Sequence, residues 1–157
     1  IVFLQIVPKI AIAPLLVVWM GFGFLPKIVM VFLVCFFPIV ISPATGLRST
    51  ATELNELAKS LGASPFHTFV KVRFLWAMPQ IFVGLKTAIS LAVIGAVIGE
   101  FVGASEGLGY VIVQSGASAN TALAFAAMGL LGVMSIVLFY GLTLIEKVLI
   151  PWAEDNE

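Results

Sequence analysis

Residues 48–79 read RSTATELNELAKSLGASPFHTFVKVRFLWAMP, and they form the one long polar stretch in an otherwise apolar chain. Four of the eight Lys and Arg residues and the single His lie in it, and Lys86 follows just beyond. We call residues 48–79 the polar island. Inside it, ELAKSLGAS (residues 56–64) is typical of a helix, a sharp turn and a second helix. The apolar sequence on both sides predicts spans that hold the island against one face of a bilayer.

The first half of the island predicts a short amphipathic helix over 51–61. Thr50 followed by Glu53 has the form of a capping box, in which two side chains bond the free N–H groups at a helix start. Apolar residues recur at helical spacing along this segment, at Leu54, Leu57, Ala58 and Leu61. One face of the helix is therefore expected to be apolar.

The second half of the island restarts a helix after a glycine. Gly62 fits the left-handed backbone position that ends many helices. Ser64 and Pro65 are residues preferred at an N-cap and at the first helical position. The apolar face of this second helix is expected to be formed by Phe66, Phe69, Val70 and Phe74. Spacing alone leaves two interpretations open: a compact knob that contacts a partner, and a loop that only links two spans.

The composition excludes an ordinary soluble protein. Of the 157 residues, 61% are hydrophobic and 10% are charged, and the mean hydropathy is +1.17. A soluble domain is about 45–50% apolar and about 25% charged, so the excess apolar surface must face lipid or a large partner. The net charge is zero and no basic stripe is interleaved with aromatic residues, so we expect no nucleic-acid partner.

Residues that carry chemistry are scarce. A single cysteine, Cys35, and a single histidine, His67, supply neither a disulfide framework nor a set of metal ligands, so we expect no metal and no cofactor. Glu53 and Glu56 lie three apart on one short helix, where a solvated or partner-facing role is favoured over paired acid–base work. Because motifs for a nucleophile or catalytic zinc are also absent, we expect no catalytic residues and no enzyme activity.

Four apolar runs predict an all-α, polytopic transmembrane bundle with about four spans, treated as one membrane domain over 1–157. The runs cover residues 8–24, 28–47, 80–104 and 121–149. About 20 apolar residues suffice to cross a bilayer. Residues 103–120 predict a loop with a short helix at Tyr110–Gln114. The chain begins at Ile1, already inside apolar sequence, so we interpret it as a fragment whose natural start lies upstream.

The third apolar run carries small residues and one acid. Gly95, Gly99 and Gly103 recur every four residues, a spacing that lets helix backbones approach closely. Glu100 lies near the far end of the run. A charged side chain at the bilayer centre costs about 2.5–3.5 kcal/mol, so Glu100 either reaches water or a packing partner, or lines a permeation path. It is therefore the candidate residue for a translocation path.

The distribution of positive charge predicts the orientation. Cytoplasmic loops carry an excess of Lys and Arg, which places the polar island in the cytoplasm. Residues 103–120 are then outside, as is Lys27, a weak exception to this rule. Lys86, near the start of the third run, is expected to extend its ammonium group toward the polar side.

The island resembles the cytoplasmic EAA loop of bacterial ATP-binding-cassette importer permeases. The family pattern is Glu-Ala-Ala, a glycine a few residues on, an apolar residue and a proline-containing end. This chain has Glu56-Leu57-Ala58, Gly62 at the expected distance, and a closing Pro79. Leu57 replaces the middle alanine, and Leu75 stands where many members carry a proline, so the chain departs from the family pattern at that bend.

Short pieces outside the island resemble the nitrate, sulfonate and taurine type of these permeases, over roughly residues 8–110. The pieces include Ala13-Pro14-Leu15, Phe36-Phe37-Pro38-Ile39, Thr45-Gly46-Leu47, Leu61-Gly62-Ala63-Ser64, Gly84-Leu85-Lys86, Glu100 and Gly107-Leu108-Gly109. Each piece is weak alone, and their joint order and spacing carry the resemblance. Members usually have more spans than this chain, which agrees with a missing upstream portion.

The resemblance implies a multi-pass permease subunit of the bacterial plasma (inner) membrane. A second permease copy, most simply an identical one, would complete the pore. A cytoplasmic ATP-binding subunit would hydrolyse ATP, and an extracytoplasmic substrate-binding protein would deliver nitrate, a sulfonate, or a thiamine-precursor or riboflavin-like molecule. Coupling to the ATPase would run through residues 53–79, chiefly through Glu56, Leu57, Ala58, Gly62, Ala63 and Ser64.

Two other functions remain open on the residues alone. A secondary transporter or channel working without an ATPase predicts ionisable residues or broken helices at mid-membrane, where Glu100 is the one candidate. A structural membrane subunit predicts no transport defect when the whole set of partner genes in the operon is deleted.

Overall fold

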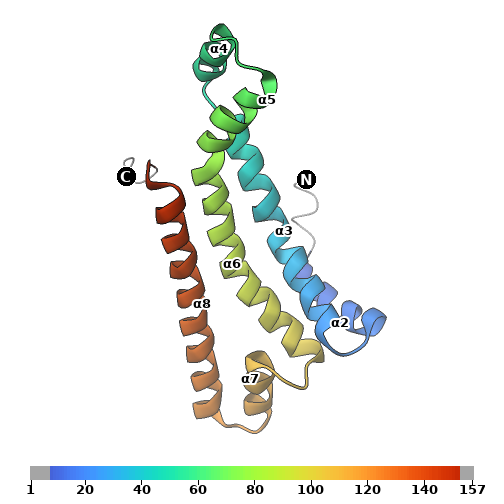
Figure 1. Cartoon of the computed structure of the whole chain (residues 1–157). Helices are drawn as coiled ribbons and strands as arrows, with labels where there is room; N and C mark the ends of the chain where they lie inside the picture. The colour runs from blue at the N-terminus through green and yellow to red at the C-terminus, as the bar shows by residue number, and fades with distance from the viewer. Residues whose placement is uncertain (1–7, 153–157) are drawn as a thin grey trace. The chain divides into compact units, whose positions relative to one another are not determined.

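The computed structural model describes residues 8–152, and every regular element in that part of the chain is helical (Figure 1). The elements in order are α2 (Lys9–Met20), α3 (Phe24–Arg48), α4 (Thr52–Ser60), α5 (Pro65–Thr68), the π-helical segment η1 (Phe69–Phe74), α6 (Leu75–Gly103), α7 (Leu108–Ala117) and α8 (Thr121–Leu149). The all-α prediction is confirmed.

The chain forms two compact units. Of the described residues, the first contains 8–37 and 88–141, and the second contains 38–87 and 142–152. The long helices α3, α6 and α8 each supply residues to both units. The polar island belongs to the second unit, and Glu100 belongs to the first.

Three helices of the described chain are long and apolar enough to cross a membrane, one fewer than the about four spans expected. They are Phe24–Arg48, Pro65–Gly103 and Thr121–Leu149. The first predicted span, over 8–24, instead forms α2, whose 12 residues extend about 18 Å. Gly21 and Gly23, at φ angles of 77° and 139°, end α2 because this left-handed backbone does not continue a helix.

The span after the polar island begins earlier than predicted. Its sequence signal covers residues 80–104, whereas α5, η1 and α6 run without a break from Pro65 to Gly103. Pro79 lies inside α6 and does not end the island's fold as predicted. The segment continues as helix because no glycine or proline interrupts residues 66–78. A wider π-helical turn, Phe69–Phe74, precedes α6.

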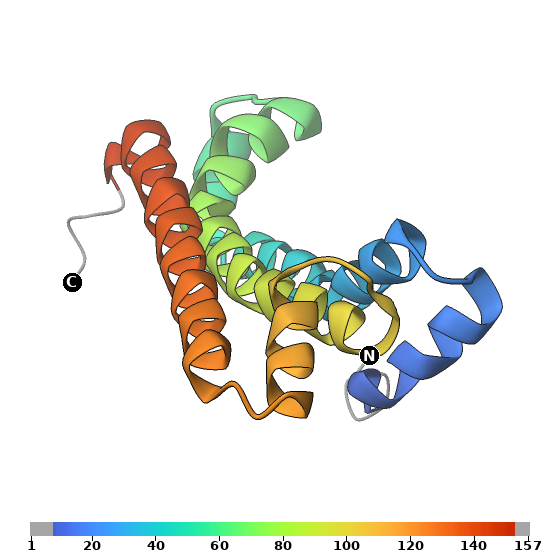
Figure 2. The same cartoon turned by 90° about the horizontal axis from the view of Figure 1, so that it is seen from below.

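The last two helices agree with the sequence more closely. The span predicted over 121–149 is confirmed as α8. The loop predicted over 103–120 does contain a helix, but α7 has ten residues rather than the five expected at Tyr110–Gln114. In Figures 1 and 2, α7 lies beside the C-terminal turns of α6.

Glycines bring α3 and α6 into close contact, as their spacing predicts. In the first unit, a methyl group added to Gly95 would lie 3.1 Å from the Cα of Val31, and one added to Gly99 would lie 3.1 Å from the Cα of Lys27. In the second unit, a methyl group on Gly84 would lie 2.5 Å from the Cβ of Ser42. The two helix backbones therefore touch with no room for side chains at these points.

The buried core of the first unit joins α2 to α3. Ala13 and Leu16 of α2 pack with Met30 and Val34 of α3. This contact explains how a helix too short to cross the membrane keeps its place, since its apolar face is covered by protein.

Candidate docking surface and outer cavity

The turn of the polar island is set by Gly62. Its φ angle is +73°, and the N–H groups of Ala63 and Gly62 donate to the carbonyls of Ala58 and Lys59, each at 3.0 Å. This pair of bonds is a Schellman motif, which satisfies carbonyls left free at a helix end. The left-handed prediction for Gly62 is confirmed. No atom lies within 4 Å of a methyl group placed on Gly62, so the requirement for glycine there comes from the backbone angle.

The helix after the turn begins as predicted. The Ser64 hydroxyl accepts a hydrogen bond from the His67 N–H at 3.3 Å, and Pro65 occupies the first turn. Ser64 therefore acts as the N-cap of α5. The exposed ring of His67 also lies 3.4 Å, through Nδ1, from the Ser64 hydroxyl.

The capping box predicted from Thr50 and Glu53 is wrong. The N-cap position of α4 is Ala51, and no side chain caps the helix. The Thr50 hydroxyl instead donates to the carbonyl of Leu47 at 3.3 Å. Because α3 extends to Arg48, Thr50 lies close enough to satisfy a free carbonyl at the end of α3 rather than an N–H at the start of α4.

Three of the exposed large apolar side chains of the island lie close to the Gly62 turn. Leu57 is 56% exposed, Leu61 78% and Phe66 74%. They flank the Gly62 turn, and we call them the apolar triad. Exposed apolar groups clustered on a polar segment are typical of a surface that a partner covers. The apolar triad therefore gives the island the chemistry of a docking surface.

The six residues predicted to contact an ATPase divide by exposure. Glu56, Leu57, Gly62 and Ser64 are exposed. Ala63 is half-buried, and Ala58 is buried and supplies a carbonyl to the turn. Ala58 and Ala63 therefore shape the turn, whereas the other four reach its surface.

A long-range tether that sequence spacing did not predict fixes the base of the island. The Arg73 guanidinium donates from Nη2 to the carbonyl of Leu47 at 3.1 Å, and so joins η1 to the end of α3. Arg73 also lines a cavity of about 420 Å³ with Lys59 and Asn55. No local pattern reveals a bond between residues 26 positions apart, since it depends on how α3 and η1 pack.

A second unpredicted contact joins α6 to α8 in the second unit. The Lys86 ammonium forms an ion pair with the Glu146 carboxylate, and both side chains are largely buried. The partner of Lys86 is thus a carboxylate of α8, which the sequence did not predict.

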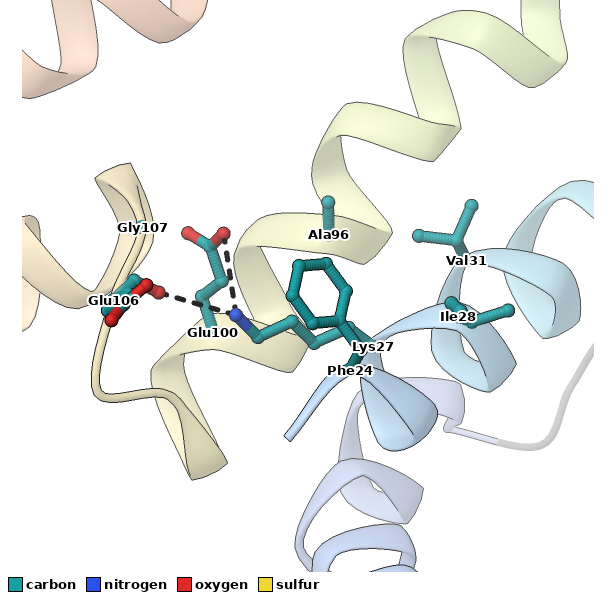
Figure 3. Close-up of a pocket in the computed structure, with 8 residues that line it drawn as sticks. All are labelled: Phe24, Lys27, Ile28, Val31, Ala96, Glu100, Glu106 and Gly107. Carbon is teal, nitrogen blue, oxygen red and sulfur yellow. Dashed lines mark hydrogen bonds and ion pairs between the residues drawn. The ribbon is translucent and has the colours of Figure 1, made fainter. Parts of the chain in front are cut away.

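Glu100 lines a cavity of about 460 Å³ in the first unit (Figure 3). One of its oxygens lies 3.9 Å from Lys27 Nζ, and the other accepts a hydrogen bond from the Gly109 N–H at 2.7 Å. Lys27 Nζ also donates to the carbonyl of Glu106 at 3.3 Å. Phe24, Ile28, Val31 and Ala96 supply apolar walls. Lys27, the exception to the expected excess of positive residues on the cytoplasmic side, is therefore paired with the Glu100 carboxylate.

No part of the chain between residues 8 and 152 gathers three His, Cys, Asp or Glu side chains in the way a metal site requires. The chemistry that the described residues offer is of two kinds. The island presents an exposed apolar surface on a fixed turn, and the cavity lined by Glu100 presents one cation beside carboxylates.

The family described as binding-protein-dependent transport system inner membrane component matches residues 1–154. The chain belongs to this family. It is a transport family rather than an enzyme family, and with the three apolar helices it makes the chain a multi-pass protein of the bacterial inner membrane. The resemblance seen in the polar island and the flanking pieces is confirmed.

Curated relatives extend the likeness. The chain is 44% identical over 138 residues to a probable ABC transporter permease of Haemophilus influenzae, covering 88% of this chain and 56% of the relative. It is 35% identical over 152 residues to a formylaminopyrimidine transport permease of Halalkalibacterium halodurans, covering 97% and 61%. It is 30% identical over 146 residues to a taurine transport permease of Escherichia coli, covering 93% and 53%. The chain thus spans little more than half the length of these relatives.

Proposed function

We propose that the chain is part of the permease subunit of an ATP-driven importer, and that the polar island docks on a cytoplasmic ATP-binding subunit. The observation that carries this proposal is the apolar triad, Leu57, Leu61 and Phe66, exposed on both sides of the fixed Gly62 turn. Family membership supports it, since the matched family works with binding proteins in transport.

Burial of the apolar triad by a partner would favour binding. Full burial of a large aliphatic or aromatic side chain contributes about 1.5–3 kcal/mol, so a partner groove that received all three would gain substantial affinity. Charged residues border the triad, with Glu56 and Lys59 exposed on α4. An apolar centre with a charged rim is the usual anatomy of a protein interface.

The same fold offers a route for movement. The helix that begins at Pro65 in the island runs without a break to Gly103, so displacement of the island by a partner would be carried into the span. Arg73, bonded to the end of α3, would pass part of that displacement to a second span. ATP hydrolysis in the partner would thereby drive alternating access, and the chain itself would catalyse no reaction.

The solute and the remaining partners follow from the relatives. Those named above transport formylaminopyrimidine and taurine, and another, 35% identical, is a riboflavin transport permease of Chloroflexus aurantiacus. We therefore propose a small organic solute, delivered outside by a substrate-binding protein. A second permease copy would complete the path, to which Glu100 would contribute at its outer end.

The docking proposal is tested by co-purification of the ATP-binding subunit with the full-length permease. Leu57→Ser should lower the amount recovered by about tenfold, because a central apolar contact is lost. Leu149→Ser is the matched control, since Leu149 at the end of α8 is 52% exposed and Leu57 56%. Equal recovery with both variants would contradict the proposal and favour a transporter or channel that works without an ATPase.

A further inference from the structure

The outer ends of three helices meet at one carboxylate. Glu100, in the last turn of α6, receives the N–H of Gly109 from the first turn of α7 at 2.7 Å. Its other oxygen lies 3.9 Å from the ammonium of Lys27, in the first turn of α3. Figure 3 shows the carboxylate of Glu100 turned toward both Lys27 and the chain at Gly107. One side chain thus contacts both neighbouring elements.

The backbone around Glu100 leaves room for that carboxylate only because two residues lack side chains. A methyl group on Gly107 would overlap the carboxylate, and one on Gly109 would lie 2.9 Å from its Oε2 and from its Cβ. The Gly107-Leu108-Gly109 segment therefore forms a cradle for the Glu100 side chain. Because this segment fits closely around the Glu100 carboxylate, the contacts with Glu100 hold the segment in position.

The Gly109 N–H has a special dependence on Glu100. Groups in the first turn of a helix have no carbonyl partner within the helix, and Val111 is the first residue of α7 whose N–H bonds back, to Gly107. Glu100 thus supplies the acceptor for Gly109. A charged acceptor makes a stronger hydrogen bond than a neutral one, whereas the 3.9 Å distance to Lys27 leaves that cation mainly to neutralise charge.

The helix held in this way is short and partly buried. With ten residues, α7 cannot cross a membrane alone, so its position depends on contacts such as the one to Glu100. Ser115 on α7 is only 2% exposed, and its hydroxyl has no hydrogen-bond partner among the described residues. α7 is thus seated with one face covered.

We propose that Glu100 is a positioning residue of the transport cycle, which latches α7 to the outer ends of α6 and α3 and must be released for solute to pass. This inference rests on the proposed importer function for the direction of passage. The Lys27–Glu100 pair is largely buried, but its N···O distance of 3.9 Å is too long for a hydrogen bond, so this ion pair adds little to the resistance against opening.

Hydrogen exchange at the Gly109 amide, in the purified full-length permease, tests the latch directly. Glu100→Leu should raise the exchange rate of this amide by about tenfold or more, since the charged acceptor is lost. Glu100→Gln keeps an acceptor and should give a smaller rise, and Lys27→Met a smaller rise still. Glu106→Gln should change nothing, because Lys27 bonds the carbonyl of Glu106 and not its side chain.

Solute uptake by the same variants tests the role in transport. Uptake should fall in the order of the exchange rates, with Lys27→Arg restoring both to the original values. Unchanged exchange in Glu100→Gln and Lys27→Met would overturn the latch, even if Glu100→Leu failed to fold. Raised exchange with normal uptake would overturn its part in transport. Hydrogen exchange at the Gly109 amide does not depend on an ATPase. The latch can therefore be confirmed or overturned by exchange even if the importer proposal fails.

Discussion

At the scale of single residues, Gly62 shows how one backbone angle builds a surface. Its φ of +73° turns the chain so that Leu61 and Phe66 stand on either side of the bend. A side chain in this left-handed region costs about 1–2 kcal/mol per residue. The identity of Gly62 therefore controls the shape of the docking surface rather than its chemistry.

Gly62→Ala should accordingly weaken association of the ATP-binding subunit by roughly 5- to 30-fold, the equivalent of about 1–2 kcal/mol. Gly116→Ala is the control, since Gly116 also has no atom within 4 Å of an added methyl but has an ordinary helical backbone in α7. Association is measured by titrating the subunit onto the detergent-solubilised permease. The account fails on this point if the two alanine variants bind the subunit equally well.

At the scale of helices, the α3–α6 seam depends on glycines where the backbones touch. Gly84→Ala would force a methyl group to 2.5 Å from the Cβ of Ser42, which requires the helices to separate. We expect a loss of about 1–3 kcal/mol in the free energy of unfolding. Gly129→Ala in α8, where nothing lies within 4 Å, should be neutral. Thermal unfolding in detergent measures the stability of both variants. An unchanged stability in Gly84→Ala would contradict the close packing of α3 and α6.

The ion pair between Lys86 of α6 and Glu146 of α8 predicts that a double variant is more stable than either single variant. Lys86→Met and Glu146→Gln should each destabilise the protein by about 2 kcal/mol, because each removes the ion pair while one largely buried charge stays in place. The double variant Lys86→Met with Glu146→Gln should be more stable than either, since both charges are gone. Denaturant unfolding of the three variants gives the comparison. A double variant as unstable as the sum of the single ones would show that the pair is not coupled.

The sequence predicted correctly those features of the helices that are set by residues a few positions apart along the chain. Gly62, Ser64 and the span over 121–149 are examples, because a turn angle, a cap and an apolar run each arise within a few positions. The short α2 was missed because its length depends on the backbone at Gly21 and Gly23. The two glycines do indicate a turn, but the apolar composition over 8–24 favoured a helix that continued to its end.

Contacts between distant segments were beyond the reach of the sequence. Arg73 bonds Leu47, and Lys86 pairs with Glu146, only because α3, η1, α6 and α8 pack as they do. The sequence could not decide whether Glu100 packs against other residues or lines a translocation path. Its partners are distant along the chain: Lys27 lies 73 positions before it and Gly109 nine positions after it.

At the scale of the whole molecule, the central claim is that the polar island couples an ATPase to transport. Gly62→Pro tests it most directly, because proline fixes φ near about −65° and cannot adopt the observed +73°. The measurement is solute uptake and ATP hydrolysis together, in vesicles that contain the full permease and its ATP-binding subunit. We predict normal membrane insertion with uptake lost or no longer tied to hydrolysis. Uptake at the original rate, with hydrolysis still coupled to it, would contradict the account.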